Sequence, residues 1–403
     1  MTRRLAGRPI RVLLAMLACA TAVAAPDAPT AGAITILYIS REQAEPSRAS
    51  LLEPAEAHYG LQGAEFGLQE INSGGRFLGK QYALIRIIVP ANGDLQAEAR
   101  KALADNTHRL VVADLQAKDL LTLGDLPEAK DTVILDARTS DDTLRQADCR
   151  ANVFHLLPNW AMRADAIGQF LARRNWKRWF LLSGVAPADQ AFGAAAKRAA
   201  GRFEAQVVTE KTFRTDSDDP SASREQIQAQ LANATRTSND YDVLFVADTS
   251  NAFGDYLLYN TAAPRLVVGT HGMVAEAWDA QFREYAARGV LYRFYKSASR
   301  EMTERDYGNS LAMAALGDAV TRGGKTDPSG IKAWFLSDQF SLAANKGEGL
   351  TFRHWDQQLR QPLLLFGPRM LVAMAPRGDP QQTKLLTDTL GFDRAHSECR
   401  RIH

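Results

Sequence analysis

The sequence is poor in cysteine and, beyond its first residues, lacks any long apolar run. Only three cysteines occur among 403 residues, which excludes a small scaffold built on disulfides. No later stretch reaches the roughly 18 uninterrupted apolar residues that a membrane-spanning helix requires. With 46% hydrophobic and 23% charged residues, the composition is that of a folded soluble protein rather than a disordered one.

Motifs that carry catalysis or bind nucleotides are also missing. The chain contains no G-x-G-x-x-G or G-x-x-x-x-G-K-[ST] loop, no G-x-S-x-G elbow and no H-E-x-x-H motif. Its seven histidines are scattered, and no Cys/His cluster has the spacing of a zinc site. We therefore expect neither an enzyme nor a metal centre.

The first 24 residues have the pattern of an export signal. A positive stretch precedes an apolar run at 12–23, and Ala22 and Ala24 supply the small residues that signal peptidase requires. Cleavage is expected after Ala24, with lipoprotein processing at Cys19 as the alternative. The positive charges of the segment are Arg3, Arg4, Arg8 and Arg11. Their removal changes the net charge from +2 to −2, so we expect a periplasmic protein with no nucleic acid partner.

Two cysteines remain after cleavage, Cys149 and Cys399. In an oxidising compartment they can pair and fasten the C-terminal tail. Two unpaired thiols are the alternative, because the sequence does not set the distance between them.

Short β-rich runs alternate with helical patterns along the mature chain, which predicts parallel sheets covered on both faces. The first series has strands at 34–39, 82–89, 110–113, 132–135 and 153–157, and the second has strands at 178–182, 206–212, 243–247 and 265–268. We also predict a helix at 275–287 and a strand at 290–295. An amphipathic helix is expected at 57–72, ended by Gly74 and Gly75.

Residues 60–85 carry a resemblance to a known family. The segment GLQGAEFGLQEIN at 60–72, the following SGG, and LGKQYALI at 78–85 resemble the first helix and second strand of type I periplasmic binding proteins. That family serves ABC importers of branched-chain amino acids and related ligands. Residues 349–362 resemble its late β-hairpin. The resemblance implies an α/β fold of two Rossmann-like lobes, joined by hinge crossings, with the ligand cleft between them.

The resemblance suggests a division of the chain into a signal peptide and two interleaved lobes. The expected parts are the signal peptide at 1–24, lobe 1 at 33–157 plus 275–340, lobe 2 at 158–274 plus 341–385, and a C-terminal tail at 386–403.

Within the family, the closest resemblance is to a subgroup associated with alcohol oxidation dependent on pyrroloquinoline quinone (PQQ). It is carried by the loop 40–59 and by FHLLPNW at 154–160. The subgroup implies PQQ, or a compound of that pathway, as the bound ligand rather than as a catalytic cofactor.

In open α/β sheets the ligand lies beyond the carboxyl ends of the strands. Those positions give the candidate ligand-binding residues Arg41, Lys118, Arg138, Thr139, Ser140, Trp160, Arg163, Phe192, Thr249, His271 and Trp278. The arginines and the lysine can meet several carboxylates, and Trp160, together with Trp278 or Phe192, can stack on a flat ring.

Amino-acid binders of this family hold the ligand carboxylate with small hydroxyl residues after the third and fourth strands. Here the third-strand loop, at 113–119, has no Ser or Thr and brings Lys118, while the fourth keeps Thr139 and Ser140 beside Arg138. This set favours a planar polycarboxylate such as PQQ over an ordinary amino acid, which remains the alternative.

We therefore expect a monomeric solute-binding protein that delivers its ligand to an ABC permease in the inner membrane. A ligand sensor that docks on a membrane receptor would have the same sequence features. A transcription regulator of the same fold would carry a DNA-binding motif where this chain has its export signal.

Overall fold

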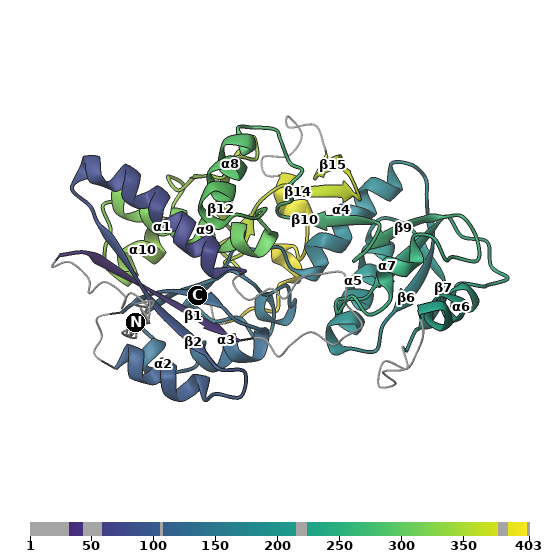
Figure 1. Ribbon diagram of the computed structural model, residues 1–403, viewed down its shortest axis with the longest axis horizontal. Helices are drawn as coiled ribbons and strands as arrows, with labels where there is room; N and C mark the ends of the chain where they lie inside the picture. The colour runs from purple at the N-terminus through teal and green to yellow at the C-terminus, as the bar shows by residue number, and fades with distance from the viewer. Residues whose placement is uncertain (1–31, 43–58, 105–107, 215–223, 378–385, 401–403) are drawn as a thin grey trace, which may run out of the picture.

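Two sheets, one parallel and one mostly parallel, are each flanked by helices and form two lobes that lie side by side in the computed structural model (Figure 1). The structure describes residues 32–42, 59–104, 108–214, 224–377 and 386–400. The expected signal peptide at 1–24, including Cys19, and most of the loop 40–59 lie outside the described residues.

Lobe 1 is built on a five-stranded sheet of order β2-β1-β3-β4-β5, in which every neighbouring pair is parallel. Its strands are β1 Ile34–Arg41, β2 Tyr82–Val89, β3 Leu110–Asp114, β4 Val133–Asp136 and β5 Val153–His155. The intervening helices are α1 Leu61–Gly75, α2 Leu95–Leu103 and α3 Ala117–Gly124. The central strands β3 and β4 are buried along their whole length, which explains why they appear in the sequence as continuous apolar runs.

Lobe 2 is built on a seven-stranded sheet of order β15-β14-β10-β9-β8-β6-β7. Its strands are β6 Arg178–Ser183, β7 Gln206–Thr212, β8 Val243–Ala247, β9 Leu266–Gly269, β10 Met273–Glu276, β14 Leu363–Gly367 and β15 Met370–Ala375. Strands β6 to β10 are parallel, and β14 and β15 are added antiparallel at one edge. The helices of this lobe are α4 Trp160–Ala172, α5 Pro187–Arg202, α6 Arg224–Ala234 and α7 Gly254–Leu257.

After β10 the chain returns to lobe 1. Helices α8 Ala287–Ala298, α9 Glu304–Thr321 and α10 Pro328–Phe335 lie with α1 in lobe 1 (Figure 1) and contribute buried residues to its core. The short strands β11 Leu342–Ala343, β12 Gly349–Phe352 and β13 Leu359–Arg360 follow. Strands β12 and β13 form the expected late hairpin. The chain thus crosses between the lobes after β5, after β10 and before β14.

The structure confirms the expected fold class but corrects two of the predicted elements. The segment at 275–287 is not a helix: it begins with the end of β10 and continues as irregular chain. The strand predicted at 290–295 is helix α8, in which Ala287, Leu291 and Phe294 are buried at helical spacing while Tyr292 and Tyr295 are exposed. The β-forming character of its valine and aromatic residues suggested a strand, but packing on lobe 1 selects the helix.

Two further differences concern boundaries. Residues 342–360 were expected in lobe 2, yet Leu342, Leu350 and Phe352 pack in the core of lobe 1. Helix α1 does not end with a left-handed residue at Gly74 or Gly75. A 3-10 turn follows it, and the left-handed conformation is taken by Gly79, at φ 64°.

Glycines allow helices α1 and α9 to pack closely in lobe 1. A Cβ atom on Gly63 would lie 2.2 Å from the backbone oxygen of Asp306, and one on Gly67 would lie 2.7 Å from Cβ of Met313. Asp306 is buried and forms part of a capping box with Thr303 at the start of α9. The glycines on this face of α1 therefore determine how closely α9 packs, and with it the polar residues of the first α9 turn.

Gly63→Ala is expected to destabilise the protein by about 2 kcal/mol, because the added methyl group would clash with the backbone of α9. Gly74→Ala is the matched control on the same helix. Its Cβ would meet no atom within 4 Å, so that change is expected to be neutral or stabilising by up to about 1 kcal/mol. Chemical denaturation of both variants measures the difference. Equal effects at the two positions would contradict the close packing of α1 on α9.

Candidate functional site

The crossing from lobe 1 to lobe 2 brings together the loop that follows β4 and the first turn of α4. The backbone N–H of Trp160 donates to the carbonyl of Ser140 at 2.9 Å, and the side chain of Asn159 caps the helix by accepting from Met162 N at 3.0 Å. This pairing fixes the orientation in which α4 leaves lobe 1. It also places the side chains of the first α4 turn next to the β4 loop.

Four of the predicted residues meet at this crossing. The Arg163 guanidinium contacts the Ser140 hydroxyl at 3.4 Å and lies 5.7 Å from the centre of the Trp160 ring. The Trp160 ring in turn lies 5.0 Å from the ring of Phe192. Phe192 is buried in the core of lobe 2, whereas Trp160 and Ser140 are partly exposed. The crossing therefore places a partly exposed indole and a hydroxyl group beside a cation.

Arg163 is itself held by groups from both lobes. Its guanidinium donates to the carbonyl of Ala275 on β10 at 2.8 Å and forms an ion pair with Glu304 on α9 at 2.7 Å. The side chain is only 8% exposed, and its Nε is buried without a hydrogen-bond partner. A ligand carboxylate at this point would have to share Arg163 with Glu304.

Thr139 belongs to a buried polar network at the end of β4. Its hydroxyl donates to Asp136 and accepts from Arg145 at 3.0 Å, and Asp136 also accepts from His155 Nδ1 at 2.7 Å. Burial and the nearby Arg145 charge lower the pKa of His155 to about 4, so the ring is neutral at physiological pH. Burial alone would raise the pKa of Asp136, but the bond from His155 and the charge of Arg145 outweigh it and lower that pKa. The network gives the β4 loop its shape.

Arg138 is partly exposed on the same loop, and its backbone N–H donates to Asp136 at 3.1 Å. It therefore lies between the buried network and the surface, one residue from Thr139 and two from Ser140. The network beneath it fixes the backbone from which its side chain projects.

Arg41 and Lys118 lie at the ends of β1 and β3, apart from that cluster. Arg41 forms a two-pronged ion pair with Asp119, at 2.6 and 3.0 Å, and its Nη1 donates to three carbonyls of the loop after β2. It thus joins α3 to two strand ends. Lys118, the neighbour of Asp119 in the first turn of α3, is exposed.

Thr249 and His271 follow β8 and β9 in lobe 2. The Thr249 hydroxyl donates to Asp189 at 2.7 Å, which links the β8 loop to the first turn of α5. The His271 ring is 7% exposed, and its Nδ1 lies 2.9 Å from the hydroxyl of Thr270. Both side chains stabilise loops at the carboxyl edge of the lobe 2 sheet.

Trp278 was expected at the cleft but lies in the core of lobe 1. It is 1% exposed and stacks on Tyr307 with ring centres 4.4 Å apart. The helix that was predicted to present it does not form, because the chain after β10 turns back to lobe 1 at this point. Trp160 and Phe192 are therefore the predicted aromatic residues that the structure brings together.

Two acidic residues at the crossing were not predicted, Glu276 and Glu304. Glu276 ends β10, where burial and the Glu304 charge raise its pKa to about 8. Glu304 is the first residue of α9, and one of its oxygens accepts from the backbone N–H of Ala277 at 2.5 Å. The capping-box pattern Thr303 to Asp306 marks the start of this helix and was a usable signal. Glu276 was missed because its segment was assigned to a helix.

A buried lysine, Lys346, lies in the chain that leads back to lobe 2. Its amine donates to the side chain of Gln361 and to the carbonyl of Pro362, both at 2.9 Å, and burial lowers its pKa to about 7. It borders a hollow of about 520 Å³ between the chain that leads into β12 and strand β15. A second hollow, of about 360 Å³, lies over α8 on lobe 1 alone.

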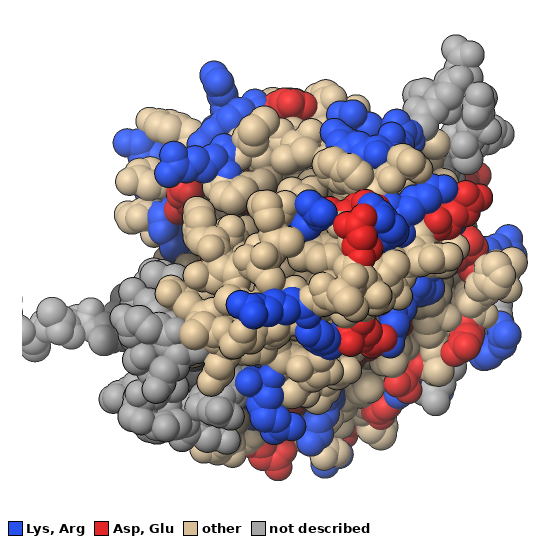
Figure 2. All heavy atoms as spheres, turned by 90° about the vertical axis from the view of Figure 1, so that its right-hand side faces the viewer, with Lys and Arg blue, Asp and Glu red and all other residues tan. Residues whose placement is uncertain are grey.

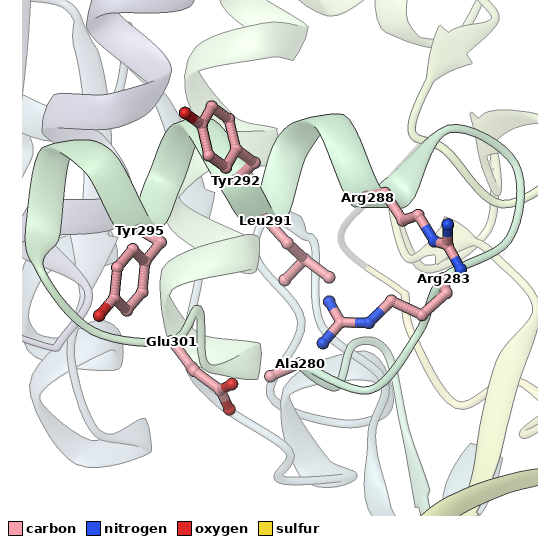
Figure 3. Close-up of a pocket in the computed structure, with 7 residues that line it drawn as sticks. All are labelled: Ala280, Arg283, Arg288, Leu291, Tyr292, Tyr295 and Glu301. Carbon is pink, nitrogen blue, oxygen red and sulfur yellow. The ribbon is translucent and has the colours of Figure 1, made fainter.

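Figure 3 shows this second hollow, in which Leu291 lies between Tyr295 and Arg283, with Ala280 and Glu301 below. None of the residues predicted to bind ligand lines either hollow. Within the described residues, no group of three or more His, Cys, Asp or Glu side chains is placed to hold a metal ion.

Charges on the outer end of lobe 2 are largely paired locally. Figure 2 shows basic and acidic side chains next to one another in several places on this face. Near β6 to β8, Arg178 pairs with both Asp240 and Asp242, at 2.5 and 2.7 Å. None of the helices in the described part of the chain combines the length and apolar character that a membrane span needs.

Glu276→Gln tests the partly buried carboxyl at the crossing. The folded-state pKa near 8 lies above the ordinary 4.5, so the wild-type protein loses stability as the pH rises through that interval. Glutamine cannot ionise, so the variant is expected to gain on the order of 1–2 kcal/mol over the wild type above about pH 8, and little near pH 5. Thermal unfolding at several pH values measures this, with exposed Glu98→Gln as control. A difference that does not change with pH would contradict the raised pKa.

Comparison with known proteins places this geometry in a family. Residues 57–366 match the model of the family described as periplasmic binding protein. Comparison with curated proteins finds no significant match.

Solved structures share the fold at low sequence identity. A branched-chain amino acid ABC transporter periplasmic ligand-binding protein from Burkholderia xenovorans has a TM-score of 0.69 at 13% identity, over 92% of this chain and all of its own. A solute-binding protein from R. palustris in complex with benzoate has a TM-score of 0.66 at 11% identity, over 92% of this chain and all of its own. A substrate-binding protein from Desulfitobacterium hafniense in complex with Leu has a TM-score of 0.61 at 15% identity, over 84% of this chain and 98% of its own. The chain belongs to the periplasmic binding protein family.

Proposed function

We propose that this protein is the solute-binding subunit of an ABC importer. We further propose that it captures a planar aromatic carboxylate and passes it to a permease in the inner membrane. PQQ is the specific candidate ligand. The proposal includes no chemistry on the ligand: the two lobes close on it, and the closed form is the one that the permease recognises.

The observation that carries the ligand class is the environment of Trp160. Its indole is partly exposed at the lobe crossing, backed by Phe192 and flanked by the Arg163 guanidinium and the Ser140 hydroxyl. An indole can stack on a flat ring, and the hydroxyl and guanidinium can donate to its carboxylate. These groups together suit an aromatic acid better than an aliphatic amino acid.

The loop after β3 supports the same ligand class. Asp114 at its start is buried, where it accepts from Tyr38 at 2.7 Å and pairs with Arg305 at 2.7 Å. Leu115 is also buried, and the loop has no small hydroxyl residue to hold an amino-acid carboxylate. That the R. palustris protein of this fold was solved with benzoate shows that the fold can hold an aromatic acid.

Two of the candidate cations for a polycarboxylate ligand already form ion pairs within the protein. Arg41 and Arg163 already have carboxylate partners, Asp119 and Glu304. A ligand carboxylate near Arg163 would share that guanidinium with Glu304. Arg138 is proposed as a further cationic contact because it is partly exposed on the β4 loop and lies two residues from Ser140. We propose Ser140, Trp160 and Arg138 as the main ligand contacts.

Tryptophan fluorescence titration tests the ligand. Saturable quenching by PQQ at micromolar concentration is expected, with a weaker response to benzoate and none to leucine. Isothermal titration calorimetry repeats the measurement without the optical interference of PQQ absorption. A clear response to leucine and none to PQQ would contradict the proposed ligand while leaving the family assignment intact.

Trp160→Ala is expected to weaken PQQ binding by about 2 kcal/mol, roughly 30-fold in Kd, because it removes the stacking face. Trp176→Ala is the matched control, since Trp176 is a partly buried tryptophan just beyond the other end of α4. Equal losses in both variants would indicate damage to lobe 2 rather than loss of a contact.

Arg138→Ala is expected to weaken PQQ binding by a similar ~2 kcal/mol, because it removes a cation that can meet a ligand carboxylate. Arg86→Ala, which removes a half-exposed arginine paired with Glu65 on lobe 1, should leave the affinity unchanged. Unchanged affinity in Arg138→Ala would show that the site does not extend to this loop.

A further inference from the structure

The C-terminal segment 386–400 contacts both lobes and the chain between them. Its first residues are bound by the hairpin of β12 and β13, the following ones lie on lobe 2, and its last part is joined to lobe 1. Each attachment is made by buried or partly buried groups.

Lobe 2 holds the segment at Leu390 and Gly391. Leu390 is fully buried in the lobe 2 core. The N–H of Gly391 donates to Asp165 of α4 at 2.8 Å, and its carbonyl accepts from Arg202 of α5 at 2.6 Å. Asp165 has no exposed surface and also pairs with Arg198 at 2.6 Å, so this anchor is rigid.

The hairpin of β12 and β13 binds the beginning of the segment. Asp388 accepts from Arg360 at 2.7 Å and from Arg353 at 3.1 Å, and Arg353 also donates to the carbonyl of Leu390 at 2.6 Å. Both arginines are nearly buried. Because the hairpin packs on lobe 1, these bonds already connect the two lobes through the segment.

The far end is attached to lobe 1 covalently. Cys399 forms a disulfide with Cys149, which belongs to the loop between β4 and β5, with a Cα–Cα distance of 5.6 Å. The neighbouring Glu398 N–H donates to the side chain of Gln146 at 2.8 Å. A single hydrogen bond contributes only about 1 kcal/mol net, so that contact alone would not resist separation of the lobes, whereas a covalent bond does.

We infer that segment 386–400 is a strap that limits how far the two lobes open. It adds a covalent connection to the crossings of the main chain, and it runs from the core of lobe 2 to the β4–β5 loop of lobe 1. The inference rests on the hinge motion of the proposed function but not on the identity of the ligand.

The strap acts as a permanent brace rather than a redox switch. Thiol–disulfide exchange requires that an attacking thiolate reach a sulfur atom. Cys149 is 0% exposed and Cys399 is 3% exposed, so the folded protein shields both sulfurs. Once formed, the disulfide persists through cycles of opening and closing.

Single-molecule energy transfer between the lobes tests the strap in the ligand-free protein. Dyes are placed through non-canonical residues at the exposed positions Gln96 on α2 and Gln230 on α6. The variant Cys149→Ser/Cys399→Ser is expected to show a longer mean distance and a wider distribution than the wild type. Because no ligand is present, the outcome is independent of whether PQQ binds.

A second variant ends at Phe392 and carries Cys149→Ser, which removes the part of the strap that is joined to lobe 1 but keeps the Leu390 anchor. It is expected to show the same shift, and far-UV circular dichroism confirms that both variants are folded. Glu65→Gln, which breaks a surface ion pair within lobe 1, is the control and should leave the distribution unchanged. Distributions identical to the wild type in both strap variants would overturn the inference.

Discussion

The bonds of Arg163 hold the two lobes in register at their first crossing. This one guanidinium, near the start of lobe 2, reaches the carbonyl of Ala275 and the carboxylate of Glu304, where the chain returns to lobe 1. A buried charge is stable only while its partners are in place, so a shift of α4 against α9 would leave Arg163 or Glu304 unpaired. The indole of Trp160 and the β4 loop are therefore presented in a fixed relation, and any hinge motion must occur around this contact.

Much of the fold follows from patterns that a sequence shows directly. Runs such as Leu110–Asp114 and Val133–Asp136 are apolar because both faces of a parallel strand are buried, and the alternation with helices then implies sheets with helical cover. Helix α8 is an element that this reasoning does not predict. Its valine and aromatic residues favour a strand locally, and only the distant contact with lobe 1 selects a helix.

The candidate site was partly predictable for the same reason. Strand ends must gather at one edge of a sheet, so Ser140, Trp160 and Arg163 were found by position. The ion partners of the arginines were not, because Asp119 and Glu304 reach them across the fold. A sequence shows that a cation lies at a strand end, but not whether a carboxylate from another element already neutralises it.

The sheet of lobe 2 ends in an edge strand, β15, whose outward Met370 and Val372 are 64% and 36% exposed. Exposed apolar edges are templates on which a second chain can add a strand. Here the strand is short and is bracketed by Arg369 and Arg377, and Pro376 follows its last residue without an N–H to donate. The charged residue at each end and the proline at one end disfavour the addition of a strand from a second chain.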